Sequence, residues 1–141
     1  MKLLLLCNKP PFPPHDGGSI ATSGKARAFA QLGHHVHILS MNTKKHYVDP
    51  EDIKKENLPE NITIELVNVN TDLKNSQALR NLLFSKIPYN AIRFQSIEFE
   101  NKLIQVLRDD TYDIVQLEGL YLSFYYDAIR STTKSNYRGL I

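Results

Sequence analysis

The sequence predicts an α/β protein: a Rossmann-like, doubly wound parallel sheet in three layers, with helices on both faces. Short apolar stretches alternate along the chain with stretches of helical period, which is typical of repeated βαβ units. The first strand, helix and strand together occupy about 40 residues, which matches one right-handed βαβ unit. A length of 141 residues is that of one domain with its own core, so we expect 1–141 to form a single domain.

The first βαβ unit opens the chain. The apolar run at 3–7 predicts a buried strand, and a proline-rich loop after it leads to the glycine pair Gly17-Gly18. A stretch of helical period then runs over 20–32 and stops at Gly33. The residues that we expect on the inner face of this helix are Ile20, Gly24, Ala28, Phe29 and Leu32.

Two strands and a short helix are expected next. Residues 35–41 read as a second buried strand. Asp49 and Pro50 favour a short helix over 50–57, because Asp caps a helix and Pro fits its first turn. The alternation of apolar and polar residues over 62–69 predicts a half-exposed strand near a sheet edge.

The second half of the chain predicts three helical segments and two further strands. The first helical segment lies around 79–87 and is broken at Pro88. A second helix is capped by Ser96 and ended by Asp109-Asp110, and its inner residues are Phe99, Leu103, Val106 and Leu107. A strand at 112–119 is followed by a short helix and by the start of a fifth strand at 137–141, and the residues on one face of that short helix are Tyr121, Phe124, Tyr125, Ala128 and Ile129. Because the sequence stops as that strand begins, we expect a piece of a longer protein, truncated before the last strands of its domain.

Composition excludes several function classes. Hydrophobic residues make up 42% and charged residues 23%, and the formal net charge of +2 is too small to indicate a nucleic-acid partner. No stretch approaches the roughly 20 apolar residues of a transmembrane helix, and the single Cys7 indicates a buried thiol in a reducing compartment. We expect a cytoplasmic protein, whose basic pairs Lys44-Lys45 and Lys54-Lys55 are solvated or make peripheral contact with the inner membrane face.

The glycine pair is the first candidate binding element. It stands where a buried strand ends and a helix starts, and ligands of parallel sheets bind at the carboxyl ends of strands. A helix N-terminus without bulky side chains presents free N–H groups to an anion such as phosphate. The alternative is a turn in which the glycines supply a positive φ. The spacing matches neither the dinucleotide fingerprint nor the P-loop, which disfavours a nicotinamide enzyme or an ATPase.

Glu118 and Gly119 form the second candidate element, at the carboxyl end of the strand predicted at 112–119. Neighbouring parallel strands end on the same side, so Glu118 is expected in the same crevice as the glycine pair. There its carboxylate would accept hydrogen bonds from sugar hydroxyls or act as a base. The alternative is that it caps the following helix.

His15 and Arg93 are candidate contacts to a charged or hydroxylated ligand, with a solvated surface position as the alternative for each. The closely spaced His34, His35 and His37 lack a carboxylate or thiol partner at suitable spacing, so no metal site is expected. The sequence holds no strained G-x-S-x-G turn and no Ser–His–Asp order, so a hydrolase nucleophile is not indicated.

The chain also resembles a known family over its whole length. The matching segments are residues 2–11, Asp16-Gly17-Gly18 before a helix, Leu32-Gly33-His34, Met41-Asn42-Thr43, residues 86–89 with Arg93-Phe94, and residues 112–122. They resemble the amino-terminal half of bacterial GT-B-type retaining glycosyltransferases with a family four-like N-terminal domain. The phrase at 112–122 and its spacing from the Pro-Pro…Gly-Gly loop are the most specific part of this resemblance.

The resemblance implies half of a GT-B fold: the acceptor-side domain of an enzyme that moves a sugar from a nucleotide-sugar donor to a saccharide or lipid-linked acceptor. It implies Gly17 and Gly18 beside the donor phosphates. The residues expected on the acceptor side are His15, Asp16, Arg93, Glu118, Gly119 and Tyr121. Many relatives carry a histidine at the strand position of Glu118, which this chain lacks, and the resemblance assigns no catalytic residue. No cofactor besides the nucleotide sugar and no metal is implied. The nucleotide-sugar domain is expected outside this chain, and without it the domain is expected to be inactive.

Two other function classes fit the same fold. A non-catalytic Rossmann-like binding or regulatory domain is one, although Asn8-Lys9 stand where a receiver domain would carry acidic residues. Half of a nucleotide-sugar isomerase with the same two-domain architecture is the other. A second domain with two glutamates that hold a nucleotide sugar would favour the glycosyltransferase.

Overall fold

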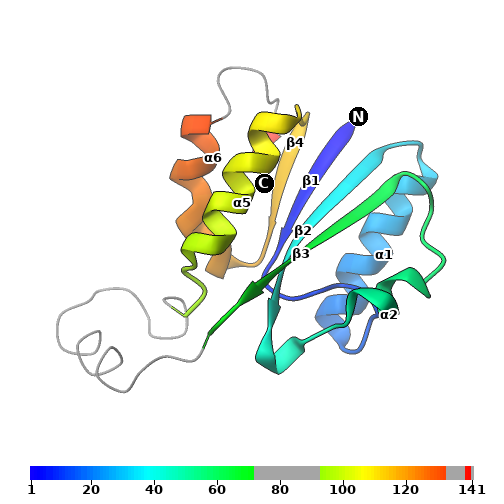
Figure 1. Ribbon diagram of the computed structural model, residues 1–141. Coiled ribbons are helices and arrows are strands. Elements are labelled where there is room, and N and C mark those ends of the chain that lie inside the picture. Colours follow the sequence, from blue (N-terminus) through cyan, green and yellow to red (C-terminus); the bar gives the residue numbers. More distant parts are fainter. Residues whose placement is uncertain (72–92, 133–138, 141) are drawn as a thin grey trace.

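The computed structural model describes residues 1–71, 93–132 and, for its backbone, 139–140 (Figure 1). Five strands form one parallel sheet in the order β3-β2-β1-β4-β5. The strands are β1 (Lys2–Cys7), β2 (His35–Thr43), β3 (Ile62–Val69), β4 (Ile114–Glu118) and β5 (Gly139–Leu140). The helices are α1 (Gly17–Gln31), α2 (Pro50–Lys54), α5 (Ile97–Asp109) and α6 (Tyr126–Thr132), with the 3-10 helices η1 (Lys44–His46) and η2 (Leu120–Tyr125).

Helices cover both faces of the sheet, as predicted. Figure 1 shows α1 and α2 on one side and α5 and α6 on the other. The strand order reverses direction between β1 and β4, which is the arrangement of a Rossmann-like doubly wound sheet. Within the described residues, no helix combines the length and apolar character needed to cross a bilayer.

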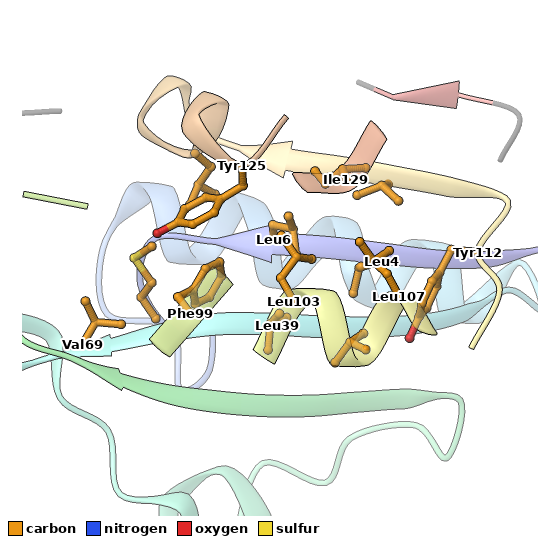
Figure 2. Packing of buried hydrophobic residues seen from close by; sticks show 14 residues of the cluster. Leu4, Leu6, Leu39, Val69, Phe99, Leu103, Leu107, Tyr112, Tyr125 and Ile129 are labelled. Atoms are coloured by element: carbon orange, nitrogen blue, oxygen red, sulfur yellow. The ribbon is translucent and has the colours of Figure 1, made fainter. Parts of the chain in front are cut away.

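The core lies on the two sides of β1. Alternate side chains of a strand point to opposite faces, so Leu4 and Leu6 enter one hydrophobic cluster while Leu3 and Leu5 enter the other. In Figure 2 the first cluster joins these two leucines to residues of the neighbouring strands and of α5, η2 and α6. The labelled members of this cluster are Leu4, Leu6, Leu39, Val69, Phe99, Leu103, Leu107, Tyr112, Tyr125 and Ile129. The second cluster includes Ala26 and Ala30 of α1.

Most of the predicted elements are confirmed. β3 lies at a sheet edge, and Gly33 ends the first helical segment with a φ of +81°. Ser96 caps α5, whose predicted inner residues Phe99, Leu103, Val106 and Leu107 are all buried. The short helix expected over 50–57 ends earlier, at Lys54, and the fourth strand occupies 114–118 of the predicted 112–119. The helical segment predicted around 79–87 with its break at Pro88 lies outside the described residues.

The inner face predicted for the first helix is wrong. α1 begins at Gly17, earlier than the 20–32 predicted, and Ile20 and Leu32 are 58% and 72% exposed. Gly24 and Ala28 are exposed as well, and of the predicted face only Phe29 packs against the core. The buried face consists of small residues, Ser19, Ser23, Ala26 and Ala30. Small side chains allow α1 to lie close to the strands. The larger apolar residues of this segment therefore do not indicate which of its faces is buried.

The segment after the fourth strand also differs from prediction. It is a 3-10 helix, η2, followed by α6, rather than one short helix. Tyr125, Ala128 and Ile129 are buried as predicted, but Tyr121 is 40% exposed and Phe124 only half-buried, while Leu122 takes a core position. A 3-10 helix turns every three residues, so its inner side chains do not follow the 3.6-residue period used for the prediction.

Candidate functional site

The candidate site lies at the carboxyl edge of the sheet, between β1 and β4. Cys7 and Glu118, the last residues of these strands, are paired in register. The chain leaves β1 toward α1 on one face, whereas α5 and α6 pack on the opposite face (Figure 1). Connections that diverge in this way open a crevice, where α/β proteins bind their ligands.

A cavity of about 250 Å³ occupies this position. Its lining residues are Cys7, Asn8, Lys9, Pro11, Gly18, Ser19, Ala21, Thr22 and Glu118. Gly18 and Glu118, which are far apart in sequence, therefore face one cavity, as their positions at neighbouring strand ends indicated. Cys7 is 2% exposed, and burial raises the pKa of its thiol, so it contributes an inert wall.

The N-terminus of α1 is held by Asp16. Its carboxylate accepts a hydrogen bond from the N–H of Ser19, and the Ser19 hydroxyl accepts one from the N–H of Asp16. The same carboxylate pairs with Lys9, with Nζ 2.6 Å from Oδ2. The hydrogen bonds from Lys9 and then Ser19 keep the pKa of Asp16 below its usual range. Asp16, predicted as an acceptor contact, thus has its carboxylate engaged in capping and in this ion pair.

Gly17 and Gly18 leave their amide groups open. The first-turn hydrogen bonds of α1 begin at Ser19 and Ile20, and within the described residues no acceptor lies on the N–H of either glycine. Neither glycine has a positive φ, so the alternative of a turn that requires one is wrong. A Cβ on Gly18 would lie 3.2 Å from the Lys9 ammonium nitrogen, whereas one on Gly17 would meet nothing within 4 Å. The close approach to Lys9 is therefore specific to Gly18.

Glu118 is held by three partners and does not cap η2. Its carboxylate accepts hydrogen bonds from Lys25 at 2.7 Å, Gln116 at 2.7 Å and Thr22 at 3.2 Å. Gly119, not Glu118, caps η2, with a φ of +118° that favours glycine. The capping alternative is thus wrong. A carboxylate that is 14% exposed and paired with Lys25 is a fixed hydrogen-bond acceptor.

A second cavity, of about 210 Å³, lies on the other side of Lys9. Its lining residues are Lys9, Pro10, His15, Asp16, Ser19, Lys45, His46, Tyr47 and Val48. This cavity brings the predicted contacts His15 and Asp16 together with the segment that follows β2. Partial burial lowers the pKa of His46, and the positive charges of Lys9, Lys45 and Arg93 lower it further, against the opposite effect of Asp16.

Arg93 and Tyr121 meet through Phe94. The guanidinium carbon of Arg93 lies 5.7 Å from the Phe94 ring centre, and the Tyr121 ring stacks on Phe94 at 5.1 Å with an interplanar angle of 21°. Arg93 also lies near enough to His46 to act on its pKa. Arg93, Tyr121 and Gly119 line neither of the two cavities beside Lys9. Their predicted role as acceptor contacts gains no geometric support.

Sequence reasoning missed several residues of this edge. Thr22 and Lys25 of α1 hold Glu118, and Lys45 and His46 line the second cavity. Lys9 separates the two cavities and was detectable, because it lies two residues after the end of the first strand. In the part of the chain that the structure describes, no group of histidine, cysteine or acidic residues is arranged to hold a metal ion.

Comparisons with known proteins bear on the fold. No family model matches the chain, and no curated protein matches it. A solved structure, the C-terminal domain of a hydrogenase from Pyrococcus furiosus, superimposes with a TM-score of 0.50 at 14% sequence identity. The match covers 92% of this chain and 84% of that one. At this identity the likeness shows a shared α/β fold alone.

Proposed function

We propose that this chain is the acceptor-side domain of a retaining glycosyltransferase, which moves a sugar from a nucleotide-sugar donor to a saccharide or lipid-linked acceptor. The observation that carries the proposal is the pair of open amide groups at Gly17 and Gly18, of which Gly18 lies beside Lys9 and lines the cavity at the carboxyl edge between β1 and β4. Backbone N–H groups and an ammonium group are the donors that a diphosphate requires.

In this proposal the chain acts by position and charge. The amides of Gly17 and Gly18 stabilise the negative charge of the leaving diphosphate, and a second domain that binds the nucleotide sugar supplies further cations. The acceptor lies on this side of the cleft, where Glu118, fixed by Lys25, receives a hydrogen bond from an acceptor hydroxyl. Because Glu118 is paired with Lys25, we assign it positioning of the acceptor and no proton transfer.

The test compares two glycine substitutions in α1 of the full-length gene product. Gly18→Val places methyl groups over the open amides and against Lys9, where a Cβ already comes within 3.2 Å. Gly24→Val is the matched control, because a Cβ there meets nothing within 4 Å on the same helix. We expect Gly18→Val to lower the rate of sugar transfer by about a hundredfold, and Gly24→Val to leave it nearly unchanged.

The assay uses a panel of nucleotide sugars with saccharide and lipid-linked acceptors, and thermal unfolding verifies that both variants are folded. Undiminished transfer by a folded Gly18→Val variant removes the glycine pair from the mechanism. No transfer by the natural protein with any donor overturns the proposal in favour of a non-catalytic binding domain. Interconversion of the nucleotide sugar without an acceptor identifies an isomerase.

A further inference from the structure

We propose that the second cavity, between the N-terminal end of α1 and the segment after β2, binds a phosphate group through Lys45 and His46. This site is separate from the open amides of Gly17 and Gly18, since neither glycine lines the second cavity. The two cavities share only Lys9 and Ser19.

The walls of this cavity come from three segments. The loop after β1 supplies Lys9 and His15, the first turn of α1 supplies Ser19, and the residues after β2 supply Lys45 and His46. A reciprocal pair of hydrogen bonds, both 2.9 Å long, joins the buried Asn42 amide to the backbone of Val48 and holds this last segment in place. The lysine and the histidine therefore stand on a segment whose two ends are fixed to the fold.

The charges around the cavity are unbalanced. Asp16 is its one acidic lining residue, and Lys9 already neutralises it. Lys45 forms no ion pair within 1–71 and 93–132, so its positive charge beside the cavity remains uncompensated. An uncompensated cation at the wall of a cavity favours the binding of an anion there.

His46 responds to these charges and adds a second donor. The positive groups that face it are Lys9, Lys45 and Arg93, and the negative group is Asp16. A bound phosphate would reverse this excess of positive charge and favour the protonated imidazole, which donates a hydrogen bond to a phosphate oxygen. Phosphate fits better than a carboxylate, because its several oxygens accept from cations that approach from different segments.

A phosphate site indicates which class of acceptor the proposed function would use. If the chain is the acceptor side of a glycosyltransferase, the acceptor carries a phosphate group, either free in solution or in a lipid headgroup. That assignment rests on the proposed function, whereas the phosphate site itself stands on the geometry of this chain. The experiment that tests the site measures phosphate binding to the chain and requires no sugar transfer. A failure of the phosphate site can therefore be distinguished from a failure of the proposed glycosyltransferase function.

The test is an NMR titration of the histidine side chains between pH 5 and 8, in inorganic phosphate and in chloride at equal ionic strength. We expect phosphate to raise the pKa of His46. His35, which pairs with Lys2 at the opposite edge of the sheet, is the internal control, and its signals should be the same in both buffers. Lys45→Gln should weaken phosphate binding roughly 3- to 10-fold. Lys54→Gln, which removes a lysine paired on the surface with Glu51, should leave binding unchanged.

The site is overturned if phosphate affects His46 no more than His35, or if Lys45→Gln and Lys54→Gln bind phosphate equally. A second arm uses vesicles that contain an anionic phospholipid. Vesicle binding that depends on Lys45 supports the site and identifies a lipid headgroup as the source of the phosphate. Binding of free phosphate alone supports the site with a soluble ligand.

Discussion

At the scale of single residues, Asp16 has two structural roles at the edge of the site. Its carboxylate caps α1 and neutralises Lys9, so the ammonium group is fixed between the two cavities. The sequence indicated a ligand contact at this position. The structure shows a residue that positions other groups, which is what an Asp directly before a helix also predicts.

The ionisation of Asp16 makes stability depend on pH. Its pKa lies below the usual value of 3.8, so its stabilising effect is complete above that pH and is lost as the pH falls through the lower pKa of the folded state. Asp16→Asn keeps a capping side chain but loses the charge. We expect the variant to be less stable than the natural protein at neutral pH, with the difference shrinking as the pH falls below 3.8.

Urea unfolding at pH values from 2 to 7 measures this difference. Asp49→Asn is the control, because Asp49 also caps a helix, α2, but its side chain forms no ion pair within the described residues. A stability difference for Asp16→Asn that does not change with pH would contradict the role of the charge.

At the scale of elements, the two long helices explain which predictions succeeded. α5 carries large apolar residues on one face, and burial of that face decides its orientation, so the sequence predicted all four of its buried residues. α1 buries serine and alanine instead, and its largest apolar residues, Ile20 and Leu32, face solvent. Apolar periodicity does not report on a helix that packs through small residues, and so the prediction for α1 was wrong.

Tyr125 joins α5 to the segment after β4. Its hydroxyl donates to the carbonyl of Phe94 at 2.7 Å and accepts from the N–H of Ser96, the cap residue of α5, at 2.9 Å. Burial, the largest cause, raises the pKa of Tyr125 to about 12, so the hydroxyl stays protonated and remains a donor over the physiological range.

Tyr125→Phe should lower the free energy of unfolding by about 1–3 kcal/mol, because it leaves the N–H of Ser96 buried without an acceptor. The adjacent Tyr126→Phe removes a hydroxyl from a side chain that is 40% exposed, and should have little effect. Urea denaturation measures both. Equal effects of the two substitutions would show that the hydroxyl of Tyr125 does not secure the start of α5.

At the scale of the whole molecule, the central strand carries the largest share of the core. Leu6 of β1 is fully buried in the cluster with α5, η2 and α6. Leu6→Ala should cost about 3–5 kcal/mol, a large part of the roughly 5–15 kcal/mol by which small domains are stable. Leu32→Ala, at a site 72% exposed, should change stability little. Denaturant unfolding of both variants measures the contrast, and a small loss for Leu6→Ala would contradict the central place of β1.

The candidate site was predictable only in its broad position. The carboxyl ends of strands in a parallel sheet lie on one side, and this rule alone predicts that Gly18 and Glu118 lie at one cavity. The partners of Glu118 were not predictable, because Thr22 and Lys25 reach it from across the crevice, and no sequence pattern marks that approach. Lys45 and His46 looked like ordinary surface residues in the sequence. Their neighbours in the cavity are determined by the turn after β2, which the sequence does not reveal.

The placement of β1 also governs how the chain assembles. Its register with β2 forms through a short local crossover, whereas its other partner begins only at Ile114. During synthesis on the ribosome, the first βαβ unit therefore carries a strand with one unpaired side until Ile114 and the rest of β4 have been made. Over that interval the nascent chain is most exposed to mispairing with a second copy, and chaperone protection would matter most there.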